Sequence, residues 1–415
     1  MTPRQWLPLI GITLCVFIFN MSEFMPIGLL TDIAKDFDVS EAKAGLLISV
    51  YAWAVAILSL PLMLALRKVQ YRPMLLVFVA LFAFFQLLSG ISSGYWMLMF
   101  SRLGVAVAHS VFWSIAAPLA VSVVPKEYSK LALSLIATGT SLAMVLGLPV
   151  GRTIGLAMGW RMTFVVIGIV AILALVLLIA VFPKVRNPGT FTLKRMPDIY
   201  RNRCLMGIYL VLAVFVTGYY LAYSYIEPFL GSAGMSETMI TLGMTVFGVA
   251  GIAGSLLFSK LYRKLGIRYL QTFIFIESVC LLLLYPSSFS WIAVMAVMAV
   301  WGLSILSFNV SLQNEALRSS PSDGSAIAMA LFSGIYNVGI AMGSLLGGFV
   351  TDAGMTDSIG FIGGAVCLCA GLFTAIWLVK RFAEREKRIA ELIDAAEQRR
   401  QIYQLNTCSH VQVIR

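Results

Sequence analysis

The sequence predicts an all-α, polytopic membrane protein whose twelve transmembrane helices form two bundles of six. Three observations support this fold class. First, 60% of the 415 residues are hydrophobic and only 12% are charged, whereas soluble domains contain about 25% charged residues. Second, apolar runs of about 20 residues, long enough for a helix to cross about 30 Å of hydrocarbon, recur along the chain. Third, a basic segment near the middle separates two halves of similar length.

The transmembrane spans are expected where the apolar runs lie, and the sequence contains twelve such runs. They cover residues 7–30, 45–66, 73–93, 96–122, 131–157, 162–183, 205–230, 238–259, 268–286, 291–313, 326–350 and 358–380. The first run has no small-residue cleavage site, so we expect a retained helix and not a removed signal peptide.

The charged residues predict which side of the membrane each loop faces. Most of the 30 Lys and Arg lie in alternate loops and in the terminal segments, including the turns at 67–72 and 260–268. The opposite loops contain mainly acidic residues, such as Asp32 and Asp352. By the positive-inside rule, both termini are expected in the cytoplasm. The net charge of +11 therefore reflects membrane topology, and no nucleic-acid partner is expected.

The chain is predicted to divide into an N-terminal bundle, a basic cytoplasmic linker, a C-terminal bundle and a tail. Their residues are 1–183, 184–204, 205–380 and 381–415. Six-helix repeats with a site between them are typical of alternating-access transporters. In this repeat, Glu23 of the first span is predicted to correspond to Glu227 of the seventh. The tail has apolar residues at helical spacing, which indicates a cytoplasmic amphipathic helix; a solvated tail is the alternative.

Glu23 is the first candidate for proton chemistry, because an ionisable side chain inside hydrocarbon is costly and is usually functional. It lies deep in the first span, in the stretch Asn20-Met-Ser-Glu23-Phe-Met-Pro26. The proline frees a backbone carbonyl and allows the helix to bend near the acid. We predict a protonatable site; a structural hydrogen bond to a neighbouring helix is the alternative.

The fourth span contains Arg102, His109, Trp113 and Ser114. His109 and Trp113 are four residues apart, so both project from one helix face. Histidine can change its charge near neutral pH, which suits proton coupling, although a buried histidine satisfied by one hydrogen bond is the alternative. Arg102 is expected to anchor neighbouring helices or to act electrostatically on a nearby acid.

The seventh span combines aromatic rings with a carboxylate, because several tyrosines precede Glu227 and Pro228. These tyrosines are Tyr219, Tyr220, Tyr223 and Tyr225. The apolar faces of a sugar pack on aromatic rings while its hydroxyl groups need dispersed donors and acceptors. The sequence therefore favours a sugar site here, with an interfacial aromatic belt as the alternative.

Other polar or aromatic side chains at membrane depth are Tyr51, Trp53, Asn309, Gln313 and Asn337. They are candidates for substrate contact, and hydrogen bonding between helices is their alternative role. Glu277, in the ninth span, has no partner that the sequence identifies. Nothing resembles a phosphate loop, a metal cluster or a nucleophile triad, so we expect neither an enzyme nor a cofactor nor a bound metal.

Several segments resemble a known family. GLPVGR at 147–152, GWRMTF at 159–164 and NMSEFMPIGLLTDIA at 20–34 resemble the drug–proton antiporter branch of the major facilitator superfamily. More narrowly, four stretches are similar to the bacterial sugar efflux transporters. They lie at 108–120, 131–152, 222–229 and 328–340. The likeness extends from the first span to the twelfth.

This resemblance implies the major facilitator fold and proton-coupled export of arabinose-like sugars, galactosides and thiogalactosides across the bacterial inner membrane. It implies as cavity residues Glu23, His109, Tyr223, Glu227 and Asn337. Two departures concern gating and not the fold. The loop at 65–72 lacks the Asp and the Gly-Arg-Arg of the superfamily signature, and Ala106 and Ala108 replace glycines of the fourth-span motif.

The predicted function is a proton-coupled, alternating-access exporter of small sugars that acts as a monomer in the lipid bilayer, driven by the proton gradient without a cofactor. Proton coupling is assigned to Glu23, His109 and Arg102. The predicted substrate-binding residues are Asn20, Glu23, Tyr51, Trp53, His109, Trp113, Ser114, Tyr223, Glu227, Asn309, Gln313 and Asn337. A multidrug or amino-acid exporter on the same fold is the alternative. A sensor that binds sugar without moving it is a third possibility.

Overall fold

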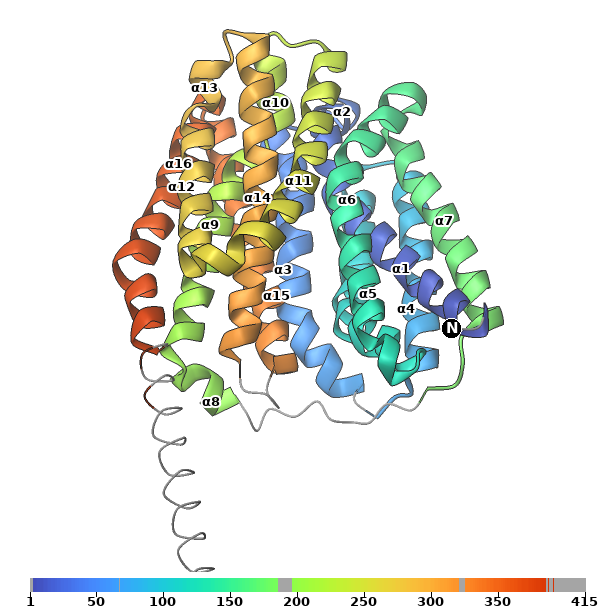
Figure 1. The fold of residues 1–415 in the computed structure, drawn as a ribbon. Coiled ribbons are helices and arrows are strands. Elements are labelled where there is room, and N and C mark those ends of the chain that lie inside the picture. The colour runs from blue at the N-terminus through green and yellow to red at the C-terminus, as the bar shows by residue number, and fades with distance from the viewer. Residues whose placement is uncertain are drawn as a thin grey trace, which may run out of the picture.

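A computed structural model of the chain describes residues 3–66, 68–185, 196–320 and 325–385, together with 387 and 391. Every regular element in this part of the chain is a helix (Figure 1). The predicted all-α, polytopic fold is therefore confirmed. The expectations about most of the linker and about the tail beyond residue 385 lie outside the described residues.

Eleven helical spans in the described residues are long and apolar enough to cross a membrane. The predicted ninth span, 268–286, is not among these eleven, and it is built from two short helices. α12 (Ile267–Leu282) ends just before α13 (Leu284–Ser287). Pro286 has no N–H to donate to the carbonyl of Leu282 four residues earlier, so the α-helical hydrogen bonding is interrupted there.

The N-terminal bundle consists of six long helices. They are α1 (Pro3–Phe24), α3 (Glu41–Leu66), α4 (Tyr71–Gly90), α5 (Tyr95–Ser122), α6 (Ser129–Met158) and α7 (Trp160–Val181). α4 packs against α5 and α7, whereas α1 packs against α6 and α7. Their buried faces form a continuous apolar core.

The C-terminal bundle repeats this plan with α12 and α13 in its third place. Its other elements are α8 (Met196–Arg201), α9 (Arg203–Tyr223), α10 (Ile226–Ser232), α11 (Glu237–Leu265), α14 (Trp291–Ser319), α15 (Ser325–Asp352), α16 (Ile359–Phe373) and the π-helix η5 (Thr374–Leu378). α9 packs against both α15 and α16, and α11 packs against α14.

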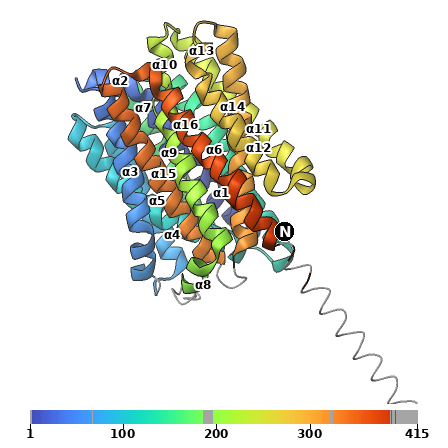
Figure 2. The same ribbon diagram turned by 90° about the vertical axis from the view of Figure 1, so that its left-hand side faces the viewer.

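The two bundles meet along two helix pairs, α3 with α15 and α6 with α11. Figures 1 and 2 both show α3, from the first half of the chain, beside α15. In the second pair, Gly248 approaches the carbonyl oxygen of Val145 so closely that a Cβ atom at 248 would collide with it. Pro149 leaves this carbonyl without its helical donor. The crossing of α6 and α11 therefore depends on both residue types.

The first and seventh spans are interrupted. α1 ends at Phe24 and is followed by the 3-10 helix η1 (Met25–Leu29) and by α2 (Leu30–Asp36), while α9 ends at Tyr223 and α10 begins at Ile226. Glu23 precedes the first break, whereas Glu227 follows the second. The predicted correspondence of these two acids is wrong. Thr31 and Glu227 are each the second residue of the short helix that follows the break, α2 and α10.

The molecule has two ends, called here the terminal end and the distal end. The terminal end contains the start of α1 and helix α8, and the distal end contains α2, α10 and α13 (Figure 1). The breaks in the first and seventh spans place short helices at the distal end, where the two halves of the chain come together.

Candidate functional site

A buried polar network in the N-terminal bundle joins Glu23 of α1, Tyr51 of α3, and Arg102 and His109 of α5. His109 Nε2 lies 3.7 Å from Glu23 Oε2, and Tyr51 Oη lies 2.7 Å from His109 Nδ1. When the tyrosine donates to Nδ1, the imidazole carries its proton on Nε2, which faces Glu23. Glu23 is the most exposed of the four, at 9%. The geometry suits proton exchange between an acid and an imidazole.

Arg102 supplies the positive charge of this network. Its Cζ lies 4.4 Å from the centre of the Tyr51 ring, and its Nη1 donates to the Ser22 carbonyl at 3.1 Å. Pro26 lacks the N–H that would otherwise bond this carbonyl in the helix, so the proline creates the acceptor that holds the arginine. Arg102 Nε and Nη2 have no hydrogen-bond partner. The guanidinium charge therefore acts on Glu23 through space.

A cavity of about 20 Å³ lies between the two bundles. Its polar and aromatic lining includes Phe24, Tyr219, Tyr220, Tyr223, Asn309 and Tyr336. Tyr336 lies beside Asn309 and Tyr220 in this wall, and the centroids of the Tyr220 and Tyr336 rings are 6.4 Å apart. Such a volume holds about one water molecule, whereas sites for small ligands measure about 300–1,000 Å³. The walls must therefore separate before a solute can bind between them.

The cavity and the polar network are adjacent. Phe24 lines the cavity from the N-terminal bundle, and its neighbour Glu23 lies within electrostatic range of Tyr220 and Tyr336 across the interface. The structure thus brings Glu23, Tyr51, Arg102 and His109 together and places Tyr223 and Asn309 in the wall opposite them.

The remaining predicted residues lie around this centre or away from it. Trp113 lies beside His109, with ring centroids 6.0 Å apart. Three polar candidates bond to the main chain of their own helix, four residues earlier: Asn20, Ser114 and Asn337. Trp53 is half-buried against the core, and Gln313 is exposed on α14. The small cavity is not lined by any of these six residues.

Glu227 lies in an ion-pair cluster at the distal end and not in the central cavity. Arg152 Nη1 is 3.2 Å from Glu227 Oε1, and the same guanidinium pairs with Glu237. Thr31 donates to Glu227 Oε2 from its backbone N at 3.1 Å and from its hydroxyl at 2.8 Å. Arg152 and Thr31 belong to one bundle and the two acids to the other. The cluster therefore ties the bundles together at this end.

The sequence reading missed the pairing of Arg152 with Glu227 and the presence of Phe24 and Tyr336 in the cavity wall. One signal pointed to the ion pair. Arg152 follows Pro149 near the end of the fifth span, and Glu227 precedes Pro228 near the same membrane depth in the seventh. Opposite charges at equal membrane depth in separate spans are expected to form an ion pair.

No group of three or more His, Cys, Asp and Glu side chains that could hold a metal ion occurs in the part of the chain that the structure describes. The chemistry available at the centre is therefore that of an acid, an imidazole, a guanidinium and phenolic hydroxyl groups.

Comparison with known proteins agrees with the helical architecture. The profile of the Major Facilitator Superfamily matches residues 12–326. A bacterial homolog of the human lysosomal transporter Spinster, in an inward-facing and unoccupied conformation, has a TM-score of 0.69 and 16% identity, over 91% of this chain and 95% of that one. A peptide transporter POT in complex with sulfate has a TM-score of 0.72 and 14% identity, over 91% and 98% of the two chains. A POT family transporter in complex with 5-aminolevulinic acid has a TM-score of 0.73 and 11% identity, over 89% and 95%.

Proposed function

The chain belongs to the Major Facilitator Superfamily and is a multi-pass membrane transporter, not an enzyme, and we propose that it exports small sugars in exchange for protons. The proposal places it as a monomer in the bacterial inner membrane, with its terminal end toward the cytoplasm. The distribution of Lys and Arg between alternate loops supports this orientation.

The observation that carries the proposal is the pairing of Glu23 with His109 beside the interface. An acid and an imidazole 3.7 Å apart share one buried environment with a single guanidinium. Adding a proton to this group changes the net charge of the buried site by one unit, which is costly inside hydrocarbon unless the surroundings rearrange. Protonation can therefore favour one arrangement of the two bundles over another.

A neutral, hydroxyl-rich solute suits the wall opposite this pair. The rings of Tyr219, Tyr220, Tyr223 and Tyr336 offer flat apolar faces, and their hydroxyl groups, with Asn309, offer donors and acceptors. Aromatic rings with a few placed polar groups are the usual composition of sites for such ligands. A cationic drug is expected to bind less well, because the Arg102 guanidinium already lies within electrostatic range of Glu23 and would repel a second positive charge.

Transport requires the closed distal end to open. In the present conformation the Arg152 cluster closes that end, and the central cavity has room for about one water molecule. We propose that sugar and proton enter and leave as the bundles rock about the central site, so that the distal ion pairs break when the terminal end closes.

The test is transport by the purified protein in liposomes. We would impose a pH gradient and follow labelled arabinose, a labelled thiogalactoside and a cationic dye in parallel. The proposal predicts sugar movement that depends on the gradient and stops when an uncoupler is added. Movement of the dye without movement of either sugar would contradict it and would assign the protein to multidrug export.

A further inference from the structure

Glu277 of α12 is a buried acid that the proposed proton pathway does not use. Its side chain is fully buried, at 0% exposure. Neither carboxyl oxygen has a hydrogen-bond partner within ordinary bonding distance. The residue lies in the middle of the ninth span, where an unpaired carboxylate would be costly.

The other buried glutamates of the described residues each have a basic neighbour. Glu23 has Arg102 and His109, and Glu227 has Arg152. Glu315, in the same bundle as Glu277, lies 3.6 Å from Arg318. Glu277 differs from all three, because no Lys, Arg or His acts on it. A carboxyl group in this position is neutral and therefore holds a proton.

Among the described residues, the helices packed around Glu277 present uncharged groups to it. Trp301 and Ser304 face it from α14. The titratable groups in its electrostatic range are Tyr219, Cys280, Tyr336 and Cys367. The Ser304 hydroxyl already donates to the Phe273 carbonyl at 2.9 Å, whereas the buried Trp301 Nε1 has no partner. A neutral carboxyl group beside an indole N–H can accept its hydrogen bond after a small rotation.

Trp301 connects Glu277 to the central cavity. Its ring centroid lies 6.1 Å from that of Tyr219, 6.0 Å from that of Tyr223 and 5.5 Å from that of Phe247. All three of these rings line the cavity. A change in the charge of Glu277 therefore acts on the wall that would contact the solute.

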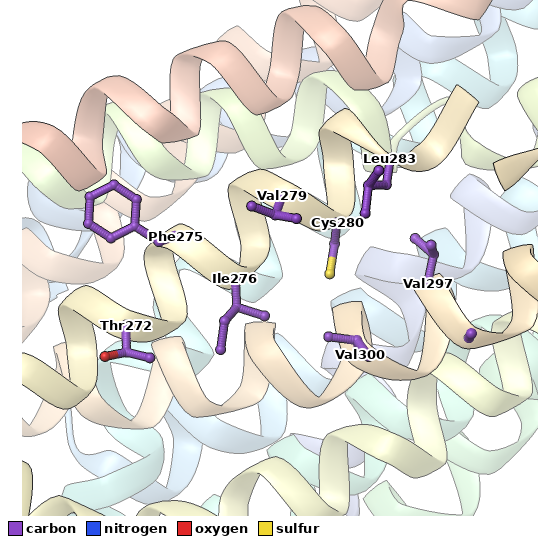
Figure 3. Close-up of a pocket in the computed structure, with 9 residues that line it drawn as sticks. Thr272, Phe275, Ile276, Val279, Cys280, Leu283, Val297 and Val300 are labelled. Carbon is purple, nitrogen blue, oxygen red and sulfur yellow. The ribbon is translucent and has the colours of Figure 1, made fainter. Parts of the chain in front are cut away.

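The opposite face of α12 offers no route for a proton. Phe275, Ile276 and Val279 line an apolar groove of about 550 Å³ together with Val297 and Val300 of α14 (Figure 3). In a membrane this open groove faces hydrocarbon, which does not conduct protons. The contacts of Trp301 with the cavity rings therefore give a proton a route to Glu277 from the cavity side, past Trp301 and Tyr219.

We propose that Glu277 is a second proton-binding site, which holds a proton while the bundles are closed as here and releases it to cavity water when the wall opens. In that step the carboxyl O–H bond breaks, the proton passes to water, and a carboxylate remains until it is reprotonated from the other side. The role of Glu277 in the transport cycle rests on the proposed proton-coupled transport.

The first test needs no transport. Infrared difference spectra of the purified protein at neutral pH distinguish a protonated carboxyl group from an ionised one. The Glu277→Gln variant, which keeps the shape of a neutral acid, is expected to lose one protonated carboxyl band. The matched control, Glu315→Gln, removes a buried but paired acid and is expected to lose none. If Glu277→Gln loses no such band, the proposal is overturned even if sugar export is established.

The second test measures coupling. At a fixed pH gradient with the membrane potential clamped, the solute gradient that proteoliposomes sustain changes about tenfold per pH unit for each proton exchanged. Glu277→Gln is expected to lower the sustained solute gradient about tenfold per unit of the imposed pH difference, while exchange of labelled against unlabelled solute continues. An unchanged sustained gradient would overturn the role in the cycle. If the wild-type protein moves no tested solute, the proposed function fails and the infrared result alone decides whether Glu277 holds a proton.

Discussion

The interiors of the two bundles carry charge differently. In the N-terminal bundle, Glu23, His109 and Arg102 lie together, and opposite charges compensate one another. In the C-terminal bundle, the interior facing the same cavity is aromatic, and one of its buried acids, Glu277, has no basic partner among the described residues. The difference indicates that the charged centre of proton coupling lies in the N-terminal half, whereas the C-terminal half contributes the aromatic wall for the solute and one neutral buried acid behind it.

This division requires that the halves communicate, and two contacts allow it. Glu23 acts electrostatically on Tyr220 and Tyr336 across the central interface. At the distal end, Arg152 of the first half holds Glu227 and Glu237 of the second. Variants that remove one of these contacts and keep the other separate their contributions.

Replacing Arg152 by Ala should open the distal end. The change leaves Glu227 buried without its cation, which costs about 3–5 kcal/mol in the closed state. Spin labels at Ser93 and Ser232, which are exposed on different bundles at this end, should report longer distances. Arg161→Ala is the matched control, because Arg161 pairs with Asp36 of its own bundle at 2.7 Å. Equal distances in Arg152→Ala and wild type would show that the cluster does not hold the bundles together.

Replacing Tyr51 by Phe should weaken proton handling without removing the acid or the imidazole. His109 Nδ1 loses its partner at 2.7 Å, which costs about 1–3 kcal/mol for a buried group. We expect pH-driven export to fall by about tenfold while exchange of sugar across the membrane continues. Tyr95→Phe serves as a control, because its hydroxyl bonds the Lys43 carbonyl in the same bundle. A parallel loss of exchange and coupled export would contradict the division between the halves.

Replacing Tyr336 by Phe should affect solute binding and leave coupling intact. It removes a hydroxyl group that lies beside Asn309 and Tyr220 in the cavity wall and that can bond to the solute, and such a hydrogen bond is worth about 0.5–1.5 kcal/mol. The half-saturating sugar concentration should rise by about two- to tenfold. Ser114→Ala is the control, since that hydroxyl bonds within its own helix. A change in the number of protons moved per sugar would place Tyr336 in the proton pathway instead.

Much of the fold followed from local features of the sequence. Hydropathy located the spans. Pro26 lies in the 3-10 helix that interrupts the first span, and Pro228 lies in the short helix that follows the interruption of the seventh. The split of the ninth span was missed although Pro286 causes it, because a proline near the end of an apolar run is easily taken for a loop residue. The cost of charge in hydrocarbon singled out Glu23 and His109, which the structure brings together.

The contacts between the bundles could not be predicted from local features of the sequence. Arg152 and Glu227 are far apart in sequence, and their pairing depends on how two bundles dock. The predicted correspondence of Glu23 and Glu227 was wrong for a related reason. It compared two residues of the same type, whereas Glu23 precedes the break after Phe24 and Glu227 follows the break after Tyr223. Tyr336 reaches the cavity only because α15 packs against α3 and α9 together.

The central claim is that Glu23 couples proton movement to a solute site formed by the other bundle, and one measurement tests it most directly. Glu23→Gln and wild-type protein in liposomes would be compared for sugar export driven by a pH gradient and for exchange of labelled against unlabelled sugar. The account predicts that the variant loses gradient-driven export and retains exchange. Gradient-driven export at the wild-type level in Glu23→Gln would contradict it.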